Sequence, residues 1–180
     1  MVFERLAHAS LTLNLANCEV GKAIVTYLGK KVGHGFVKPV EAKIEAILNF
    51  PKPCNKRELR RFLGMSGYYR GFCKNFSSVV TPLTDLLSTS RVKWSYESDR
   101  AFEAAKDLLC NAPVLIAPNF DLQFKLQVDA STSGAGAFLI QEDAHGIEHP
   151  VSYFSRKFLK HQQANHRKRS PGLTMGTAAF

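Results

Sequence analysis

The sequence has few acidic residues and no long apolar run. It has 15 acidic residues against 24 lysines and arginines in 180 residues, which gives a formal net charge of +9 and a pI near 9.5. No apolar run approaches the roughly 20 residues of a membrane span, so we expect no membrane partner. The N-terminus resembles an amphipathic helix start rather than a signal peptide, which favours an intracellular protein.

Cysteine is also scarce. The four cysteines, Cys18, Cys54, Cys73 and Cys110, form no C-x-x-C pair, and the six histidines show no metal-ligand spacing. A zinc site is therefore not expected. Without a secretory signal, free thiols in a reducing compartment are the default.

The composition that remains is that of a globular protein with a basic excess. Hydrophobic residues make up 45% and charged residues 22% of the chain, which excludes a wholly disordered protein. The length is that of one or two small domains. The positive charge favours a polyanionic partner, most simply nucleic acid.

The first part of the chain predicts a helix, a hairpin and further helices. Residues 3–10 have helical spacing, the alternating leucines of residues 11–15 predict a strand, and residues 23–28 predict another. Pro39 is expected to open a helix that ends before Pro51. Asn55, with Glu58 three residues later, resembles a capping box and starts a helical stripe that extends to Cys73.

The second part changes from helices to strands. Residues 79–87 predict a third helix, and Ser95 is the expected N-cap of a strongly amphipathic helix ending near Asn111. Three apolar runs, near residues 124–129, 133–141 and 150–154, are joined by short turns and predict an antiparallel meander. Residues 165–180 have no clear period and resemble a disordered basic tail.

Several short sequence motifs indicate a relationship to a known family when they are taken together and in order. Residues 57–65 are RELRRFLGM and residues 67–72 are GYYRGF; PVL follows at 113–115, VDAS at 128–131, GAGA at 134–137 and PVSYFS at 150–155. This series, over about residues 2–163, resembles the Pol polyprotein of gypsy-type long-terminal-repeat retrotransposons.

The resemblance implies an α+β fold: a β-hairpin plus a helical thumb, then a truncated RNase H-like antiparallel three-stranded sheet. Its expected parts are the end of a reverse-transcriptase palm, with helix and hairpin (1–38), the helical thumb (39–90), the connection (91–120), a partial RNase H-like domain (121–160) and an aberrant tail (161–180). The carboxylates of the polymerase would lie upstream of Met1, so we expect no polymerisation by this chain alone.

The best candidate for binding is the thumb helix. Six basic residues lie between positions 56 and 74, against one acid, and such side chains neutralise backbone phosphates. The resemblance implies contact with the template–primer duplex, a DNA duplex or an RNA–DNA hybrid. The implied nucleic-acid-binding residues are Arg57, Arg60, Arg61, Phe62, Gly64, Tyr68, Arg70 and Lys74. Gly64, Gly67 and Gly71 lie three or four residues apart, so they are expected to share one helix face that permits close approach of another surface, and the resemblance implies that this face follows the minor groove of the duplex. The alternative is helix–helix packing, with Phe62 and Tyr68 as core aromatics and the arginines merely solvated.

Asp129 is the chemical candidate. The resemblance implies that it is the first carboxylate of the RNase H metal site, which uses Mg²⁺ to hydrolyse the RNA strand of a hybrid. One carboxylate cannot hold two ions, so we expect Asp129 to be a vestigial catalytic and metal ligand, with no Mg²⁺ bound productively. In the alternative, Asp129 only caps a turn. Gly134 and Gly136 are better explained by close strand packing than by a nucleotide loop.

The tail offers a separate hypothesis. In the family, a helix with a pattern like T-x-E-K-E follows the third strand, whereas this chain has NHRKRSPGLTMGTAAF. Codon degeneracy allows a one-base shift to convert that string into the family pattern, so we interpret the tail as an out-of-frame translation.

The sequence as a whole leaves three hypotheses about function: a fragment that descends from a reverse transcriptase and RNase H, a non-catalytic nucleic-acid-binding module, or a translated remnant without function.

Overall fold

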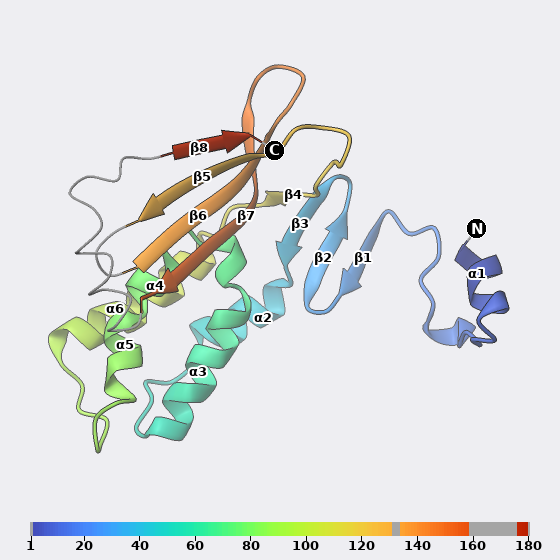
Figure 1. Cartoon of the computed structure of the whole chain (residues 1–180). Helices are drawn as coiled ribbons and strands as arrows, with labels where there is room; N and C mark the ends of the chain where they lie inside the picture. The colour runs from blue at the N-terminus through green and yellow to red at the C-terminus, as the bar shows by residue number, and fades with distance from the viewer. Residues whose placement is uncertain (1, 131–133, 159–175, 180) are drawn as a thin grey trace.

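The structure, a computed structural model, describes residues 2–130, 134–158 and 176–179. Two antiparallel sheets accompany a group of helices (Figure 1). The first sheet has the order β1-β2-β3-β4 and the second the order β7-β6-β5-β8. The α+β fold predicted from the sequence is confirmed.

The elements follow one another along the chain with short connections. The helices are α1 (Val2–His8), η1 (Leu15–Asn17), α2 (Glu41–Leu48), α3 (Lys56–Tyr68), η2 (Arg70–Phe72), α4 (Phe76–Val79), α5 (Thr81–Leu86) and α6 (Tyr96–Cys110). The strands are β1 (Ile24–Tyr27), β2 (Lys30–Gly33), β3 (Phe36–Pro39), β4 (Leu115–Ile116), β5 (Lys125–Ala130), β6 (Gly134–Glu142), β7 (Glu148–Lys157) and β8 (Gly176–Ala179).

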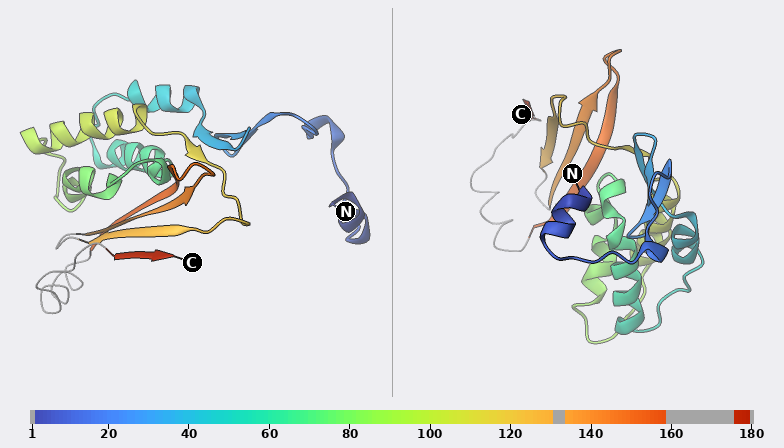
Figure 2. Two further views of the ribbon diagram at one scale, coloured as in Figure 1. Left: turned by 90° about the horizontal axis from the view of Figure 1, so that it is seen from above. Right: turned by 90° about the vertical axis from the view of Figure 1, so that its right-hand side faces the viewer.

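The N-terminal segment lies away from the rest of the molecule. No residue of α1 is buried, and the left view of Figure 2 shows this helix apart from the other helices and the sheets. The strand expected at residues 11–15 is wrong: Leu11 and Leu13 are exposed, and a 3-10 turn begins at Leu15. Alternation alone makes no strand here because these residues have no neighbouring strand to pair with.

A hairpin forms, but the run expected at residues 23–28 pairs with the strand that follows it and not with residues 11–15. A third strand, β3, extends it. β1 and β2 pair through Tyr27 and Lys30, so the turn between them has two residues, Leu28 and Gly29. Both have positive φ, 47° and 71°, as the two-residue turns that match strand twist require. Pro39 ends β3 instead of opening a helix; α2 begins two residues later.

The core lies among α2, α3, α5 and α6. Its buried members include Ile47, Leu59, Phe62, Tyr69, Phe72, Cys73, Phe76, Leu83, Phe102 and Leu109. The expected N-caps of α3 and α6 are confirmed. The Asn55 side chain accepts the Glu58 backbone N–H at 2.9 Å, and Ser95 and Ser98 form a reciprocal pair. The third expected helix is divided at Val80 into α4 and α5.

Helix α3 is shorter than its sequence stripe predicts. It ends at Tyr68, and the chain continues with i→i−3 bonds: the Phe72 N–H donates to the Tyr69 carbonyl at 2.9 Å. This tighter turn places Phe72 and Cys73 in the core. Gly71 therefore does not share a helix face with Gly64 and Gly67, and the expectation of one glycine stripe is wrong.

The second sheet confirms the expected meander. β5, β6 and β7 pair antiparallel, with a register irregularity between Leu139 and Ile140. A fourth strand, β8, pairs with β5, so residues 176–179 form regular structure where the sequence predicts none. The other residues of the expected aberrant tail, 161–175 and 180, lie outside the described residues. Helices pack on the β7 side of the sheet, and β8 forms the opposite edge (Figure 2).

Candidate nucleic-acid interface

One side of α3 is buried and the opposite side is exposed. Leu59, Phe62 and Ser66 face the core at spacings of three and four residues. On the other side, α3 carries exposed residues that we call the α3 outer face: Arg57, Arg60, Arg61, Gly64 and Tyr68. Four of them follow the spacing i, i+4, i+7 and i+11, so they form a stripe along three turns.

The charges of the outer face are not neutralised by the protein. Among the described residues, none of the three arginines forms an ion pair, whereas lysines elsewhere do, such as Lys31 with Glu41 at 2.6 Å. The one acid in the first turn, Glu58, is occupied by the helix cap: it accepts the Cys54 N–H at 2.7 Å. The outer face therefore presents free positive charge to solvent.

The glycines of α3 do not pack against another helix. A methyl group at Gly64 or Gly67 would meet no atom of the described chain within 4 Å, apart from the helix itself. The helix-packing alternative therefore finds no partner at these positions. Gly71 is different, because a methyl group there would lie 3.8 Å from the Ser152 Oγ and the Tyr153 carbonyl oxygen of β7.

The two aromatic candidates of α3 have separate environments. Phe62 is 0% exposed, with its ring centroid 4.6 Å from Phe102 and 5.6 Å from Phe50. The core-aromatic alternative is thus right for Phe62, and its side chain is unavailable to a duplex. Tyr68 is 50% exposed, and its hydroxyl donates a hydrogen bond to the Leu28 carbonyl. Tyr68 is therefore the aromatic residue at the outer face.

Arg70 and Lys74 lie beyond the end of α3. Both are exposed, and the Lys74 Nζ lies 5.1 Å from the centroid of the Phe138 ring on β6. They belong to the segment between α3 and α4, which includes η2. The structure thus brings Arg57, Arg60, Arg61, Gly64 and Tyr68 together, and places the remaining two basic candidates further along.

Asp129 stands on β5, opposite Gly136 of β6, and its side chain is exposed. It lines a pocket of about 120 Å³ together with Asn75, Ser78, Gly134, Ala135, Gly136 and Ser155. No group of three or more His, Cys, Asp or Glu residues in the described ranges could hold a metal ion. The residues around Asp129 therefore do not fit a pair of magnesium ions, whose chemistry requires further carboxylates.

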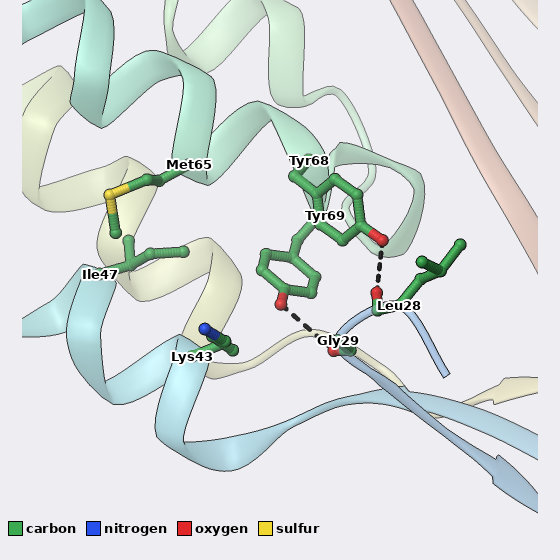
Figure 3. Close-up of a pocket in the computed structure, with 7 residues that line it drawn as sticks. All are labelled: Leu28, Gly29, Lys43, Ile47, Met65, Tyr68 and Tyr69. Atoms are coloured by element: carbon green, nitrogen blue, oxygen red, sulfur yellow. Dashed lines mark hydrogen bonds between the residues drawn. The ribbon is translucent and has the colours of Figure 1, made fainter. Parts of the chain in front are cut away.

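A larger pocket lies beside Tyr68 (Figure 3). It has a volume of about 410 Å³ and is lined by Leu28, Gly29, Lys43, Ile47, Met65, Tyr68 and Tyr69. Three elements supply these residues: the β1–β2 turn, α2 and α3. Burial raises the pKa of the Tyr69 hydroxyl, with a smaller contribution from Tyr68, so this hydroxyl stays a hydrogen-bond donor.

Comparison with known proteins finds one matching family model and several relatives that match most of the chain. Residues 94–173 match the family model of the RNase H-like domain found in reverse transcriptase. A retrovirus-related Pol polyprotein from transposon 297 of Drosophila melanogaster is 37% identical over 164 residues, which are 90% of this chain. The Tf2-3 transposon polyprotein of Schizosaccharomyces pombe is 34% identical over 89% of the chain. The chain is related to retrotransposon Pol polyproteins.

The relationship to Pol covers most of this chain and a small share of its relatives. The chain spans 15% of the transposon 297 polyprotein and 12% of the Tf2-3 polyprotein. Among solved structures, the foamy viral protease-reverse transcriptase in complex with an RNA/DNA hybrid is similar with a TM-score of 0.72 and 25% identity, over 90% of this chain and 22% of that one. The foamy viral protease-reverse transcriptase dRH, in complex with double-stranded DNA, gives a TM-score of 0.71 and 25% identity, over 90% and 29% of the two chains.

These comparisons confirm the resemblance stated from the sequence motifs. Over most of its length the chain is similar to retrotransposon Pol polyproteins, and its fold is similar to that of a reverse transcriptase, with an RNase H-like domain matched at residues 94–173. Among the helices that the structure describes, none combines the length and apolar character that a membrane crossing needs.

Sequence reasoning missed the pocket beside Tyr68. Lys43, Met65 and Ile47 come from two different helices, and neither helix alone indicates a cavity between them. One local signal was present: Leu28 and Gly29 interrupt two β-type runs as a two-residue turn. The signal predicts the turn, but not that both tyrosines at the end of α3 reach it.

Proposed function

We propose that this Pol-related chain binds a DNA duplex or an RNA–DNA hybrid through the α3 outer face. The observation that carries the proposal is the set of exposed arginines, Arg57, Arg60 and Arg61, which have no acidic partner in the described structure. Exposed arginines of this kind bind phosphates without regard to base sequence. Gly64, one turn after Arg60 and Arg61, leaves room for the phosphate backbone of a duplex to approach the helix.

The solved relatives support the choice of partner. The foamy viral protease-reverse transcriptase has been solved in complex with double-stranded DNA and with an RNA/DNA hybrid. Because this chain spans only a small share of the curated Pol relatives, reverse transcription and RNA removal by a longer parent protein are also proposals. In that parent, this segment would hold the duplex rather than build it.

We further propose that the chain does not cleave hybrids by itself. Asp129 has no second carboxylate or histidine beside it among the described residues that would complete a metal-binding group. If it descends from an RNase H ligand, it is a vestigial one. Cleavage of a labelled hybrid in Mg²⁺, lost in Asp129→Asn, would overturn this part of the proposal.

The salt dependence of binding tests the proposal directly. A labelled 20-base-pair duplex and the matching hybrid are titrated with the 180-residue chain, and fluorescence anisotropy is followed at several salt concentrations. With three phosphate contacts, affinity should fall about 40-fold between 50 and 200 mM salt. No binding at 50 mM would instead favour a translated remnant without function, and binding that is independent of salt would contradict the role of the arginines.

A further inference from the structure

The pocket beside Tyr68 has the character of a ligand site. Its volume of about 410 Å³ lies in the range of small-molecule pockets, about 300–1,000 Å³. Its lining is mainly apolar and includes two tyrosine rings, with Ile47 buried at 1% exposure. In Figure 3 the side chains of Met65 and Ile47 lie close together on one side of the Tyr69 ring, and Lys43, which also lines the pocket, lies near that ring.

Hydrogen bonds from α3 fix one wall of the pocket. The Tyr69 hydroxyl donates to the Gly29 carbonyl at 3.2 Å, and the Tyr68 hydroxyl donates to the Leu28 carbonyl (Figure 3). The Val40 N–H also donates to the Gly29 carbonyl, at 3.1 Å. A methyl group at Gly29 would lie 3.0 Å from the Tyr69 hydroxyl, so glycine is needed for this approach as well as for its positive φ. The wall is thus formed before any ligand arrives.

The charge at the margin of the pocket is positive. Within the described ranges, Lys43 forms no ion pair. Two acids, Glu41 and Glu45, lie two residues from Lys43 in sequence. Glu41 is held by Lys31 and Lys38, and the Lys31 hydrogen bond is the main cause that lowers the pKa of Glu41 to about 2. Glu45 is two residues from Lys43 on α2, and residues at this spacing do not face each other on a helix. Lys43 is therefore available to an anion.

We propose that this pocket takes one unpaired nucleotide of the nucleic acid bound on the α3 outer face. The base would lie in the apolar cavity against Tyr68 and Met65, and its phosphate would bind the Lys43 ammonium group. Tyr68 belongs to both the outer face and the pocket, so a strand on the arginines passes the entrance. Aromatic side chains stack on any base, and a base must leave the duplex stack before it can enter. This inference rests on the proposed function.

The test compares two ligands on the full chain. One is a blunt 20-base-pair duplex, and the other is the same duplex with a single unpaired nucleotide at one 3′ end. The unmodified chain should bind the overhang ligand about fivefold more tightly or better, as expected for one stacked base. The quantity to compare among variants is this affinity ratio, which cancels any change in binding to the outer face.

Two substitutions and a control identify the pocket as the source of the ratio. Met65→Trp fills the cavity and Lys43→Gln removes the cation, so both should bring the ratio close to one. Lys93→Gln removes a similar exposed charge elsewhere and should leave it unchanged. Far-ultraviolet circular dichroism checks that Met65→Trp folds, and Lys43→Gln tests the proposal independently.

Each outcome decides the proposal. If the duplex binds but the overhang adds nothing, the pocket proposal is wrong while the proposed function stands. If the overhang effect persists in both Met65→Trp and Lys43→Gln, the unpaired nucleotide binds elsewhere and the pocket proposal is again wrong. If neither ligand binds, both proposals fail together. An overhang effect that both substitutions remove supports the pocket.

Discussion

Removing Arg60 and Arg61 together should weaken duplex binding about 30-fold at 0.15 M salt. Each phosphate contact contributes about 0.9 to the slope of log affinity against log salt, which corresponds to about fivefold in affinity at 0.15 M relative to 1 M salt. Both arginines are exposed on the α3 outer face and have no ion-pair partner in the described structure, so their loss leaves no buried charge unpaired. The salt slope itself should decrease by about 2.

The variant Arg60→Ala/Arg61→Ala is suited to this test because alanine favours the helix. Substitution by alanine at exposed helical positions does not lower helix propensity, and the ring contact that would be lost is that of the Arg61 guanidinium, 6.0 Å from the centroid of the Phe50 ring. Thermal unfolding should therefore remain close to that of the unmodified chain. Anisotropy titrations at four salt concentrations give the affinity and the slope together.

A matched control separates a local effect from a change in net charge. Arg91→Ala/Arg100→Ala also lowers the formal charge by two, at exposed positions before and within α6. This control should keep most of the affinity and the full salt slope. Equal losses in the two double variants would show that the net charge, and not the outer face of α3, attracts the duplex. No loss in Arg60→Ala/Arg61→Ala would refute the proposed interface outright.

Three further predictions test the core, an ion pair and the vestigial site. Phe62→Leu should lower the free energy of unfolding by about 1–2 kcal/mol in urea titrations, yet leave the affinity of the folded chain for a duplex unchanged; a selective loss of affinity would restore Phe62 as a contact. Glu41 has its pKa lowered to about 2, chiefly by the hydrogen bond from Lys31, so it stabilises the fold above pH 4.5 and loses this effect as pH falls towards 2. Urea titrations should therefore show that Glu41→Gln is less stable than the unmodified chain at pH 6, with the difference disappearing near pH 2; a constant difference would contradict the ion pair. Neither the unmodified chain nor Asp129→Asn should cleave an RNA–DNA hybrid in Mg²⁺, as judged on a denaturing gel, and cleavage by the unmodified chain alone would give Asp129 a catalytic role.

Local side-chain chemistry was sufficient to predict the starts of α3 and α6. Asn55 and Ser95 have short side chains that accept the N–H groups of the first turn, and both caps form. The three strands of the second sheet were also predicted, because alternation and short turns specify a meander. These features depend on residues close in the sequence, which is why the sequence alone indicates them.

The errors concern residues whose position depends on distant parts of the chain. The stripe from Leu59 to Cys73 was interpreted as one helix, but burial of Phe72 and Cys73 requires a tighter turn after Tyr68. Phe62 lies next to three arginines in the sequence, but it faces Phe102, forty residues away. Strand β8 depends in the same way on pairing with β5, which no local pattern reveals.

The surroundings of Asp129 combine both kinds of information. The close strand packing predicted for Gly134 and Gly136 holds at Gly134, where a methyl group would lie 2.7 Å from the Arg156 carbonyl oxygen of β7. At Gly136 the tight neighbour instead comes from the helical region, because a methyl group there would lie 3.1 Å from the Asn75 Oδ1. The Ser77 N–H donates to the Ser155 Oγ at 2.9 Å, and the Ser77 hydroxyl donates to the Ser155 carbonyl at 2.8 Å, so α4 is fixed on β7.

The segment between Tyr68 and Asn75 connects the α3 outer face to the pocket that Asp129 lines. Arg70 and Lys74 are exposed between Tyr68 and Asn75, so the chain itself leads from the arginines to the margin of the Asp129 pocket. Because α4 is hydrogen-bonded to β7, the helices and the sheet cannot change their spacing without breaking those bonds. These contacts therefore set where the second sheet, with Asp129 on β5, lies relative to the helices.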